Sequence, residues 1–342
     1  MSEIPSQFSG PGLVDLQVNG YAGFDFNSDP ESWAADDFRQ VAKALNKRGV
    51  VAALPTMITD DVEAMLARVS KYALLLKSNP DLEQTFPGLH IEGPFISSED
   101  GPRGAHPIAH CRVPRELPDF LTDLLTASND RISLITLAPE LEGAIKLIKE
   151  AAHSGICVAL GHTQAGPDIL EQAVRAGAKM STHLGNGSHQ LLPRLDNYIQ
   201  AQLAHDSLMA SFIADGHHIP FYALKNFIRA KDPGRSVLVT DAISAAEKGA
   251  GGYKLGNEKV MVREDLHVSK PGQSNLAGSA LTLDRAIINV VTYCDVPFET
   301  AWEMASIHPA SLIKLQAIPD ITVEIKTTSF FRINVGHEGN GN

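Results

Sequence analysis

Apolar and polar positions along this chain alternate in a way that predicts short buried strands separated by amphipathic helices. The stretch 156–188 shows the pattern clearly, because the apolar run 156–160 is bounded by glycines and is too short for a helix. Apolar residues then recur at helical spacing after Pro167, which suits a first helical turn, and Gly177 provides a C-terminal stop. A second short apolar run, 178–182, follows. We therefore predict a βαβ unit here.

The same alternation continues through most of the chain and predicts eight strands with helices between them. The predicted strands are 12–18, 50–56, 88–93, 132–137, 156–160, 178–182, 208–214 and 236–240. The predicted helices are 32–48, 60–77, 117–127, 140–152, 167–177 and 221–230, with further helices beginning near 283 and 297. Eight strands that alternate with helices are typical of an α/β fold, the (β/α)8 TIM-type barrel.

Three segments fall outside this alternation. The long segment 95–118 is rich in Pro, Gly and His and lacks helical periodicity, which indicates a loop over the site. Residues 249–273 combine strand-like alternation with turn signals and predict an inserted hairpin. The tail from residue 321 alternates like one or two strands. We assign residues 10–318 to the barrel, and residues 319–342 to a C-terminal β remnant and tail.

Length, composition and charge narrow the class of protein. A chain of 342 residues with 44% apolar content can bury a large core as one domain. The sequence has no apolar run of about 18 residues and no secretion leader, so we expect a cytoplasmic protein with no membrane partner. A net charge of −11 argues against nucleic acid as a partner. Three cysteines without a CxxC motif indicate a reducing compartment.

Polar side chains gather at the carboxyl ends of the predicted strands, where parallel α/β folds place their sites. In chain order these residues are Gln17, Asn19, Glu92, His162, His183, Asp215, His217, His218 and Asp241. A carboxylate and two imidazoles suit a zinc-like divalent ion that keeps an open position for water. The ion would lower the pKa of that water toward about 7, and Asp241 could take its proton and return it to a leaving group. A single histidine at a strand end is often structural, and Asp241 alone could cap a helix. We therefore infer a metal site because several such side chains gather at the same end of the barrel.

Seven separated motifs occur in a single order along the chain. They are His-Ile-Glu-Gly-Pro-Phe at 90–95, Gly-Ala-His-Pro at 104–107, Gly-His-Thr at 161–163, Thr-His-Leu at 182–184, Ala-Asp-Gly-His-His at 214–218, Val-Thr-Asp-Ala at 239–242 and Leu-Ala-Gly-Ser-Ala-Leu at 276–281. Together they resemble the N-acetylglucosamine-6-phosphate deacetylase family of the amidohydrolase superfamily. The resemblance extends from about residue 12 to residue 315.

The resemblance implies a reaction and a set of roles. The family removes the N-acetyl group of N-acetylglucosamine 6-phosphate, giving glucosamine 6-phosphate and acetate. Glu92, His162 and His183 would hold one divalent metal, with zinc expected and iron, cobalt or manganese also suited to such ligands. Asp241 would be the general base and acid, and His106 would polarise the acetyl carbonyl. The implied substrate-binding residues are Asn186, Gly187, Arg194 and His218, with the backbone of Leu276, Ala277, Gly278 and Ser279. Arg194 would reach the phosphate in the neighbouring subunit of a homodimer.

Some positions depart from the family pattern. Gln17 and Asn19 replace the His-x-His of many superfamily members, and because neutral amides are poor zinc ligands we regard them as vestigial second-metal positions. The loop Leu-Gly-Asn-Gly-Ser at 184–188 leaves open a different N-acyl amino sugar, such as the galacto epimer. A catalytically silent sugar-phosphate-binding protein is a further alternative. Because the barrel begins almost at residue 10, we expect the family's small β domain to be reduced to a remnant.

Overall fold

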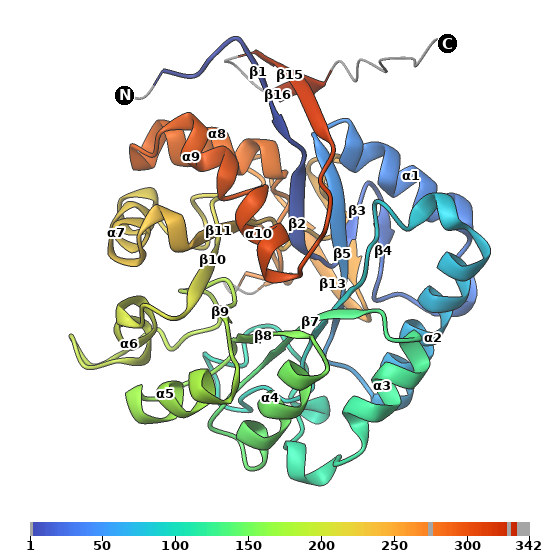
Figure 1. Cartoon of the computed structure of the whole chain (residues 1–342), viewed down its shortest axis with the longest axis vertical. Helices are drawn as coiled ribbons and strands as arrows, with labels where there is room; N and C mark the ends of the chain where they lie inside the picture. Colours follow the sequence, from blue (N-terminus) through green and yellow to red (C-terminus); the bar gives the residue numbers. More distant parts are fainter. Residues whose placement is uncertain (1–2, 273–275, 327–329, 334–342) are drawn as a thin grey trace.

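The structure, a computed structural model, describes residues 3–272, 276–326 and 330–333. Eight parallel strands form the barrel: β2 (Leu13–Val18), β5 (Val50–Ile58), β6 (Leu89–Glu92), β7 (Ile132–Leu137), β8 (Cys157–Leu160), β9 (Met180–Ser181), β10 (Met209–Ile213) and β11 (Ser236–Val239). Each strand pairs with its neighbour in chain order, and a parallel bridge between Val18 and Ala242 joins the first strand to the last. The predicted (β/α)8 barrel is therefore confirmed (Figure 1).

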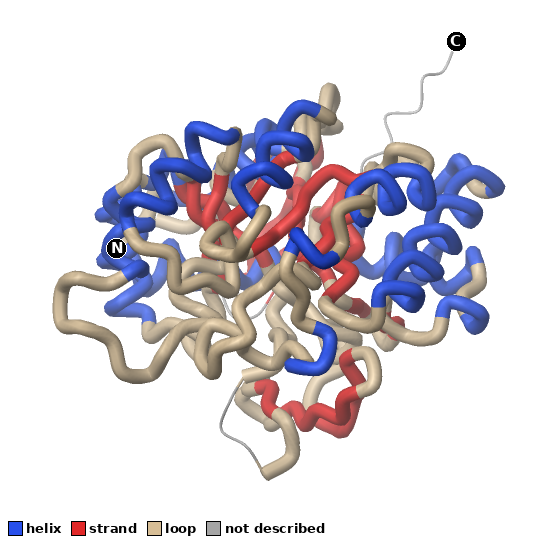
Figure 2. The backbone as a smooth tube through the Cα atoms, turned by 90° about the horizontal axis from the view of Figure 1, so that it is seen from below, coloured by secondary structure: helices blue, strands red, loops and turns tan. Residues whose placement is uncertain are grey.

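Helices surround the strands as an outer ring (Figures 1 and 2). They are α1 (Ala35–Asn46), α2 (Val62–Ser78), α3 (Phe120–Ser128), α4 (Ala144–His153), α5 (Pro167–Ala176), α6 (Tyr198–Ala204), α7 (Phe221–Lys231), α8 (Leu283–Cys294), α9 (Phe298–Glu303) and α10 (Ile307–Leu312). Short 3₁₀ helices are η1 (Pro30–Ser32), η2 (Pro80–Leu82), η3 (Ile108–His110), η4 (Pro114–Glu116) and η5 (Pro233–Arg235). No helix in the described parts of the chain is long and apolar enough to cross a membrane.

Local sequence explains why these elements form where they do. Pro167 occupies the first turn of α5, and the N–H of Gly177 closes the helix on Ala173 and Val174 carbonyls, as the βαβ prediction expected. Helix α6 was not predicted. Its signal is Asn197, whose side chain accepts hydrogen bonds from the first free N–H groups of the helix.

The barrel interior contains a buried polar layer beneath its carboxyl end. His90 lies 3.3 Å from the hydroxyl of Thr56 and 2.8 Å from that of Thr136, which in turn contacts Thr182 at 2.7 Å. Burial lowers the pKa of His90 to about 4, so its imidazole is neutral at pH 7. Hydrogen bonds to hydroxyls on both sides satisfy this neutral ring and fix the floor of the site.

A small antiparallel sheet combines the two ends of the described chain. Its strands are β1 (Gln7–Pro11), β15 (Asp320–Lys326) and β16 (Phe330–Ile333), in the order β1-β15-β16 (Figure 1). The sequence predicted a β remnant from the C-terminal segment alone, but one strand comes from the N-terminus. Of the predicted remnant 319–342, residues 327–329 and 334–342 lie outside the described residues.

The predicted hairpin is a three-stranded antiparallel sheet formed by β12 (Gly251–Leu255), β13 (Glu258–Val262) and β14 (Val268–Ser269). Figure 2 shows these strands as a group below the barrel. Leu255, Val260 and Val268 pack with Ile243 and Ala277 in a second small core, which fastens the hairpin over the barrel's carboxyl end. The hairpin also contacts a two-stranded unit, β3 (Gly20–Tyr21) with β4 (Phe24–Asp25). Residue 273, the last of the predicted hairpin, lies outside the described residues.

Candidate active site

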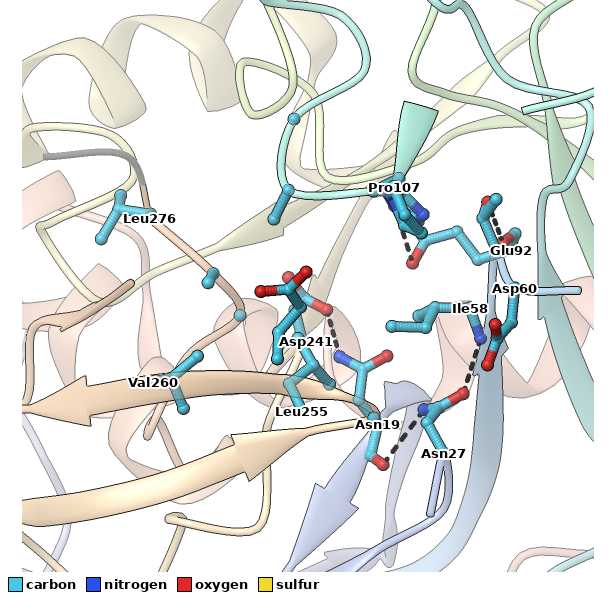
Figure 3. Close-up of a pocket in the computed structure, with 18 of the residues that line it drawn as sticks. Asn19, Asn27, Ile58, Asp60, Glu92, Pro107, Asp241, Leu255, Val260 and Leu276 are labelled. Atoms are coloured by element: carbon cyan, nitrogen blue, oxygen red, sulfur yellow. Dashed lines mark hydrogen bonds and ion pairs between the residues drawn. The ribbon is translucent and has the colours of Figure 1, made fainter. Parts of the chain in front are cut away.

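A cavity of about 240 Å³ opens at the carboxyl ends of the barrel strands (Figure 3). Many of the residues predicted from strand ends and motifs line it: Asn19, Glu92, His106, His162, His183, Asn186, Asp241, Leu276, Ala277 and Gly278. Others lie outside its lining: Gln17, Gly187, Arg194, His218 and Ser279. The cavity thus brings together side chains from the first to the last strand of the barrel.

Three of these side chains leave their strands through an uncommon backbone conformation. His162 follows β8 with φ of 52°, His183 follows β9 with φ of 27°, and Asp241 follows β11 with φ of 50°. Positive φ values in residues with a Cβ cost free energy, and they persist where the surrounding structure fixes them, often at active sites. The repeated turn directs all three side chains into one cavity.

The Glu92 carboxylate is the centre of the site. Its Oε1 lies 3.0 Å from Nε2 of His183 and 3.3 Å from Nε2 of His162. Its Oε2 lies 4.0 Å from Nε2 of His106. Potential ligand atoms of Glu92, His106 and His162 all lie within 4.8 Å of one another. The structure therefore places His106 beside the carboxylate, although farther from it than His162 and His183.

The hydrogen bonding of His162 makes this cluster suitable for binding a cation. Nδ1 of His162 lies 2.8 Å from the carbonyl oxygen of Pro102, so this nitrogen carries the proton and donates it. In the neutral imidazole, Nε2 then presents a lone pair toward the negative Oε1 of Glu92. Two acceptors facing each other are stabilised by a cation between them, and a backbone carbonyl that fixes the tautomer is typical of metal-bound histidines.

The charges of the cluster depend on its neighbours. Burial opposes ionisation of Glu92, but the two neighbouring imidazoles outweigh it and hold its pKa well below the ordinary value. Burial also acts to lower the pKa of His183, yet the hydrogen bond that His183 donates to Glu92 and the charge of that carboxylate raise it overall. Burial and the adjacent His162 lower the pKa of His106 to about 3, so His106 is neutral.

Gln17 and Asn19 support the two carboxylates of the site. Nε2 of Gln17 donates to Oε1 of Glu92 at 2.9 Å, and Nδ2 of Asn19 donates to Oδ1 of Asp241 at 2.7 Å. Figure 3 shows Asn19 beside Asp241, with Glu92 further along the wall. Burial and the charge of Glu92 raise the pKa of Asp241, and the Asn19 bond opposes that rise. Both amides are therefore engaged by carboxylates.

The residues predicted to bind substrate lie at different depths. Asp215 holds His218 in place, because its Oδ2 lies 2.7 Å from Nδ1 of His218 and its Oδ1 accepts the backbone N–H of His218 at 2.9 Å. Nε2 of His218 is buried and has no hydrogen-bond partner among the described residues. Gly187 lies so close to His162 that a Cβ would stand 2.9 Å from its Nδ1, so the loop 184–188 packs tightly against this histidine. Arg194 lies exposed in a surface loop.

Several residues that line the cavity were not predicted: Asn27, Asp60, His110, Glu258 and Lys270. Asn27 binds the end of β5, because its amide donates to the carbonyl of Thr56 at 2.9 Å and its oxygen accepts from the N–H of Ile58 at 2.9 Å. Glu258 and Lys270 come from the hairpin. The sequence predicted the inserted hairpin, but no sequence pattern indicated that the charged residues of this hairpin reach the cavity.

Comparisons of sequence identify relatives along most of the chain. No family model matches the chain. Human N-acetylglucosamine-6-phosphate deacetylase is 37% identical over 316 residues, covering 90% of this chain and 74% of the relative. The Vibrio furnissii protein of the same name is 32% identical over 307 residues with the same coverage, 90% and 74%. N-acetylgalactosamine-6-phosphate deacetylase from Shewanella sp. (strain ANA-3) is 34% identical over 314 residues, 91% of this chain and 75% of the relative.

Solved structures agree with the sequence relatives. The N-acetylglucosamine-6-phosphate deacetylase of Pasteurella multocida matches with a TM-score of 0.82 at 27% identity, covering 94% of this chain and 83% of that one. The Thermotoga maritima enzyme matches with a TM-score of 0.81 at 26% identity, covering 96% and 90%. Fold, cavity and relatives agree, and the chain belongs to the N-acetylglucosamine-6-phosphate deacetylase family of hydrolases.

Proposed function

We propose that this protein hydrolyses the N-acetyl group of N-acetylglucosamine 6-phosphate, releasing acetate and glucosamine 6-phosphate. The observation that carries the proposal is the meeting of Glu92, His162, His183 and Asp241 around one buried cavity at the carboxyl end of the barrel. Three of them form a cluster suited to a cation, and the fourth is a carboxylate that can exchange a proton. This combination supplies what metal-assisted hydrolysis of an amide needs, a site for an ion that activates water and a group that transfers its proton.

One divalent ion would be held by Glu92, His162 and His183, with zinc as the expected metal and iron, cobalt or manganese as alternatives. The carboxylate–imidazole contacts and the fixed tautomer of His162 support this ligand set. When bound, the ion would polarise the amide carbonyl and acidify a water molecule. Because Gln17 and Asn19 already bond to carboxylates, we propose a single metal site.

Asp241 is proposed as the general base and then the general acid. It accepts a proton as water attacks the acetyl carbon and donates it to the departing amine. Burial keeps its proton affinity high enough for that return, and the bond from Asn19 orients the carboxylate. His106, neutral and buried, is proposed to donate a hydrogen bond to the acetyl oxygen as negative charge develops there.

The sugar phosphate is proposed to bind between two loops. Asn186 and Gly187 follow the second predicted metal histidine, and Asn186 lines the cavity together with Leu276, Ala277 and Gly278. We propose that the backbone of Leu276, Ala277, Gly278 and Ser279 contacts the sugar. His218, held by Asp215, is proposed to offer the substrate its Nε2, which has no hydrogen-bond partner among the described residues. In a homodimer, Arg194 would approach the phosphate of the neighbouring subunit. Its exposed loop also carries Leu191 and Leu195, with 92% and 76% of their surfaces exposed.

A second candidate substrate is the galacto epimer, N-acetylgalactosamine 6-phosphate, because the Shewanella relative that is 34% identical carries that name. A silent sugar-phosphate-binding protein is less well supported, since binding alone needs no buried proton-exchanging carboxylate beside a cation cluster. We also propose a cytoplasmic location, which the three free cysteines support.

The test is deacetylation by the metal-loaded protein of N-acetylglucosamine 6-phosphate, its galacto epimer and unphosphorylated N-acetylglucosamine. We expect the first to have the highest kcat/KM. A higher value for the galacto epimer would reassign the substrate. Equal turnover with and without phosphate would contradict a sugar-phosphate deacetylase, and absence of turnover on all three would favour the silent binder.

A further inference from the structure

The cavity has an unusual balance of charge for a protein that would bind a phosphate ester. Four carboxylates line it, from Asp60, Glu92, Asp241 and Glu258. Among the described lining residues, Lys270 is the only lysine or arginine. A phosphate monoester carries about −1.5 to −2 charges at pH 7, so it needs a cationic partner in such a cavity.

The fold holds Lys270 over the cavity rather than leaving it in solvent. Lys270 directly follows β14, and its Nζ donates to the carbonyl oxygen of Ala105 at 3.4 Å. The same Nζ lies 3.3 Å from Oε2 of Glu258, and only 21% of the lysine side chain is exposed. Ala105 directly precedes His106 in the loop 95–118 and packs against the small core that fastens the hairpin. Lys270 therefore bridges the hairpin and the loop that carries a proposed active-site residue.

The neighbouring backbone keeps this lysine beside the substrate loop. Ser269 forms an antiparallel bridge with Leu276, and the N–H of Ala277 donates to the carbonyl of Val268 at 3.3 Å. Figure 3 shows Leu276 on the same side of the cavity as Leu255 and Val260 of the hairpin. Lys270 and the 276–278 loop are thus parts of one wall.

We propose that Lys270 is the residue of this chain's own wall that recognises the anionic group of the substrate, with Glu258 as its partner when no substrate is bound. The inference rests on the proposed function, because it deepens the recognition of a sugar phosphate. The phosphate takes the place of Glu258 beside Nζ, so binding exchanges one ion pair for another. An arginine from a second subunit would act on the same group from outside the chain and would not replace this contact.

Binding to the metal-loaded full-length protein tests the inference without depending on turnover. Dissociation constants are measured by calorimetry for glucosamine 6-phosphate and for glucosamine. We expect Lys270→Gln to weaken binding of glucosamine 6-phosphate by about tenfold or more, since one charged hydrogen bond is lost, while glucosamine binding is unchanged. Lys270→Arg restores binding of the phosphate ester in part, because the positive charge remains.

Two further variants sharpen the test. Glu258→Gln removes the competing carboxylate and is expected to tighten binding of glucosamine 6-phosphate. Lys259→Gln is the matched control, because Lys259 lies on the same strand as Glu258 but is exposed and does not line the cavity. It should leave both dissociation constants unchanged.

The inference is overturned if Lys270→Gln affects both sugars equally or neither, or if Lys259→Gln has the same effect. The kinetic counterpart is a raised KM for the phosphorylated substrate with kcat nearly unchanged. A wild-type protein that binds glucosamine 6-phosphate through Lys270 but removes no acetyl group would contradict only the proposed function. If the wild type removes the acetyl group normally and Lys270→Gln leaves binding of glucosamine 6-phosphate unchanged, only the inference is contradicted.

Discussion

The side-chain amide of Asn19 donates a 2.7 Å hydrogen bond to Oδ1 of Asp241, a residue 222 positions away in the sequence. Asn19 directly follows the first barrel strand, and Asp241 lies just beyond the last one. The bond crosses the seam where the barrel closes, next to the bridge between Val18 and Ala242. The protonation of the proposed general base is therefore coupled to closure of the barrel.

Removing this bond should shift the pH dependence of the reaction. Burial and the charge of Glu92 raise the pKa of Asp241, and the Asn19 bond opposes them, so Asn19→Leu should raise that pKa further. A base must be deprotonated to act, and the acidic limb of the kcat/KM profile should therefore move to higher pH. The measurement is a pH–rate profile of both proteins at saturating metal. An unmoved limb would mean that Asp241 is not the group titrating there.

Replacing the proposed base itself separates proton transfer from metal binding. Asp241→Asn keeps the shape and the hydrogen-bonding oxygen of the side chain but cannot accept the proton. We expect the variant to retain its metal and to lose turnover by about 10²- to 10⁴-fold, the usual size of a general acid–base contribution. Elemental analysis and single-turnover kinetics provide the two readouts. Near-normal turnover would reject the role of Asp241.

The close group of Glu92, His106 and His162 makes the choice of metal ligands testable. We expect His183→Ala to lose most of the metal, and His106→Ala to keep it while kcat falls. Metal content after dialysis, with thermal unfolding to verify folding, is the measurement. If metal is instead lost only in His106→Ala, then His106 is a metal ligand and His183 is not.

The sequence was informative where local pattern decides structure. Short apolar runs between amphipathic helices predicted the eight barrel strands, because a strand that is buried on both faces consists almost entirely of apolar residues. Once the strands were placed, Glu92, His162, His183 and Asp241 followed as strand-end residues. Their convergence at the strand ends indicated a metal site with a proton-transferring carboxylate, the motif resemblance implied the individual roles, and these roles stay predictions.

Features that depend on distant contacts could not be predicted. Strand β1 pairs with β15 across almost the whole chain, and neither segment alone indicates its partner. His106 lies on a long loop without periodicity, so its 4.0 Å approach to Glu92 depends on how that loop folds back. Lys270 reaches the cavity only because the hairpin docks on the barrel through its own small core.

Asp15 is predicted to make stability depend on pH. Burial raises its pKa to about 7, although hydrogen bonds from Thr240 and the backbone of Gln17 oppose the rise. The folded protein therefore binds a proton more tightly than the unfolded chain, and the free energy of unfolding should fall as pH rises from about 4 to about 7. The slope from this group is at most about 1.4 kcal/mol per pH unit.

Asp15→Asn isolates that contribution. In the wild type, the N–H of Thr240 donates to Oδ1 of Asp15 at 3.2 Å. The amide oxygen of the variant can still accept this hydrogen bond, but its side chain no longer titrates. We expect the variant to gain stability relative to the wild type between pH 5 and pH 7.5 in urea unfolding, by up to about 3 kcal/mol over that range. Parallel pH dependence of the two proteins would contradict the assignment of a raised pKa to Asp15.

Arg194 is predicted to act in the neighbouring subunit, and mixed dimers can reveal this. Arg194→Ala and Asp241→Asn should each be poorly active alone. In a mixed dimer, one site would then combine the intact Asp241 of one chain with the intact Arg194 of the other, while the second site would lack both. After denaturation, random mixing and refolding, about a quarter of all sites should be intact, so activity should recover to about a quarter of the wild-type value. If Arg194 instead serves the site of its own chain, every site in the mixed dimer carries one defect and mixing restores nothing.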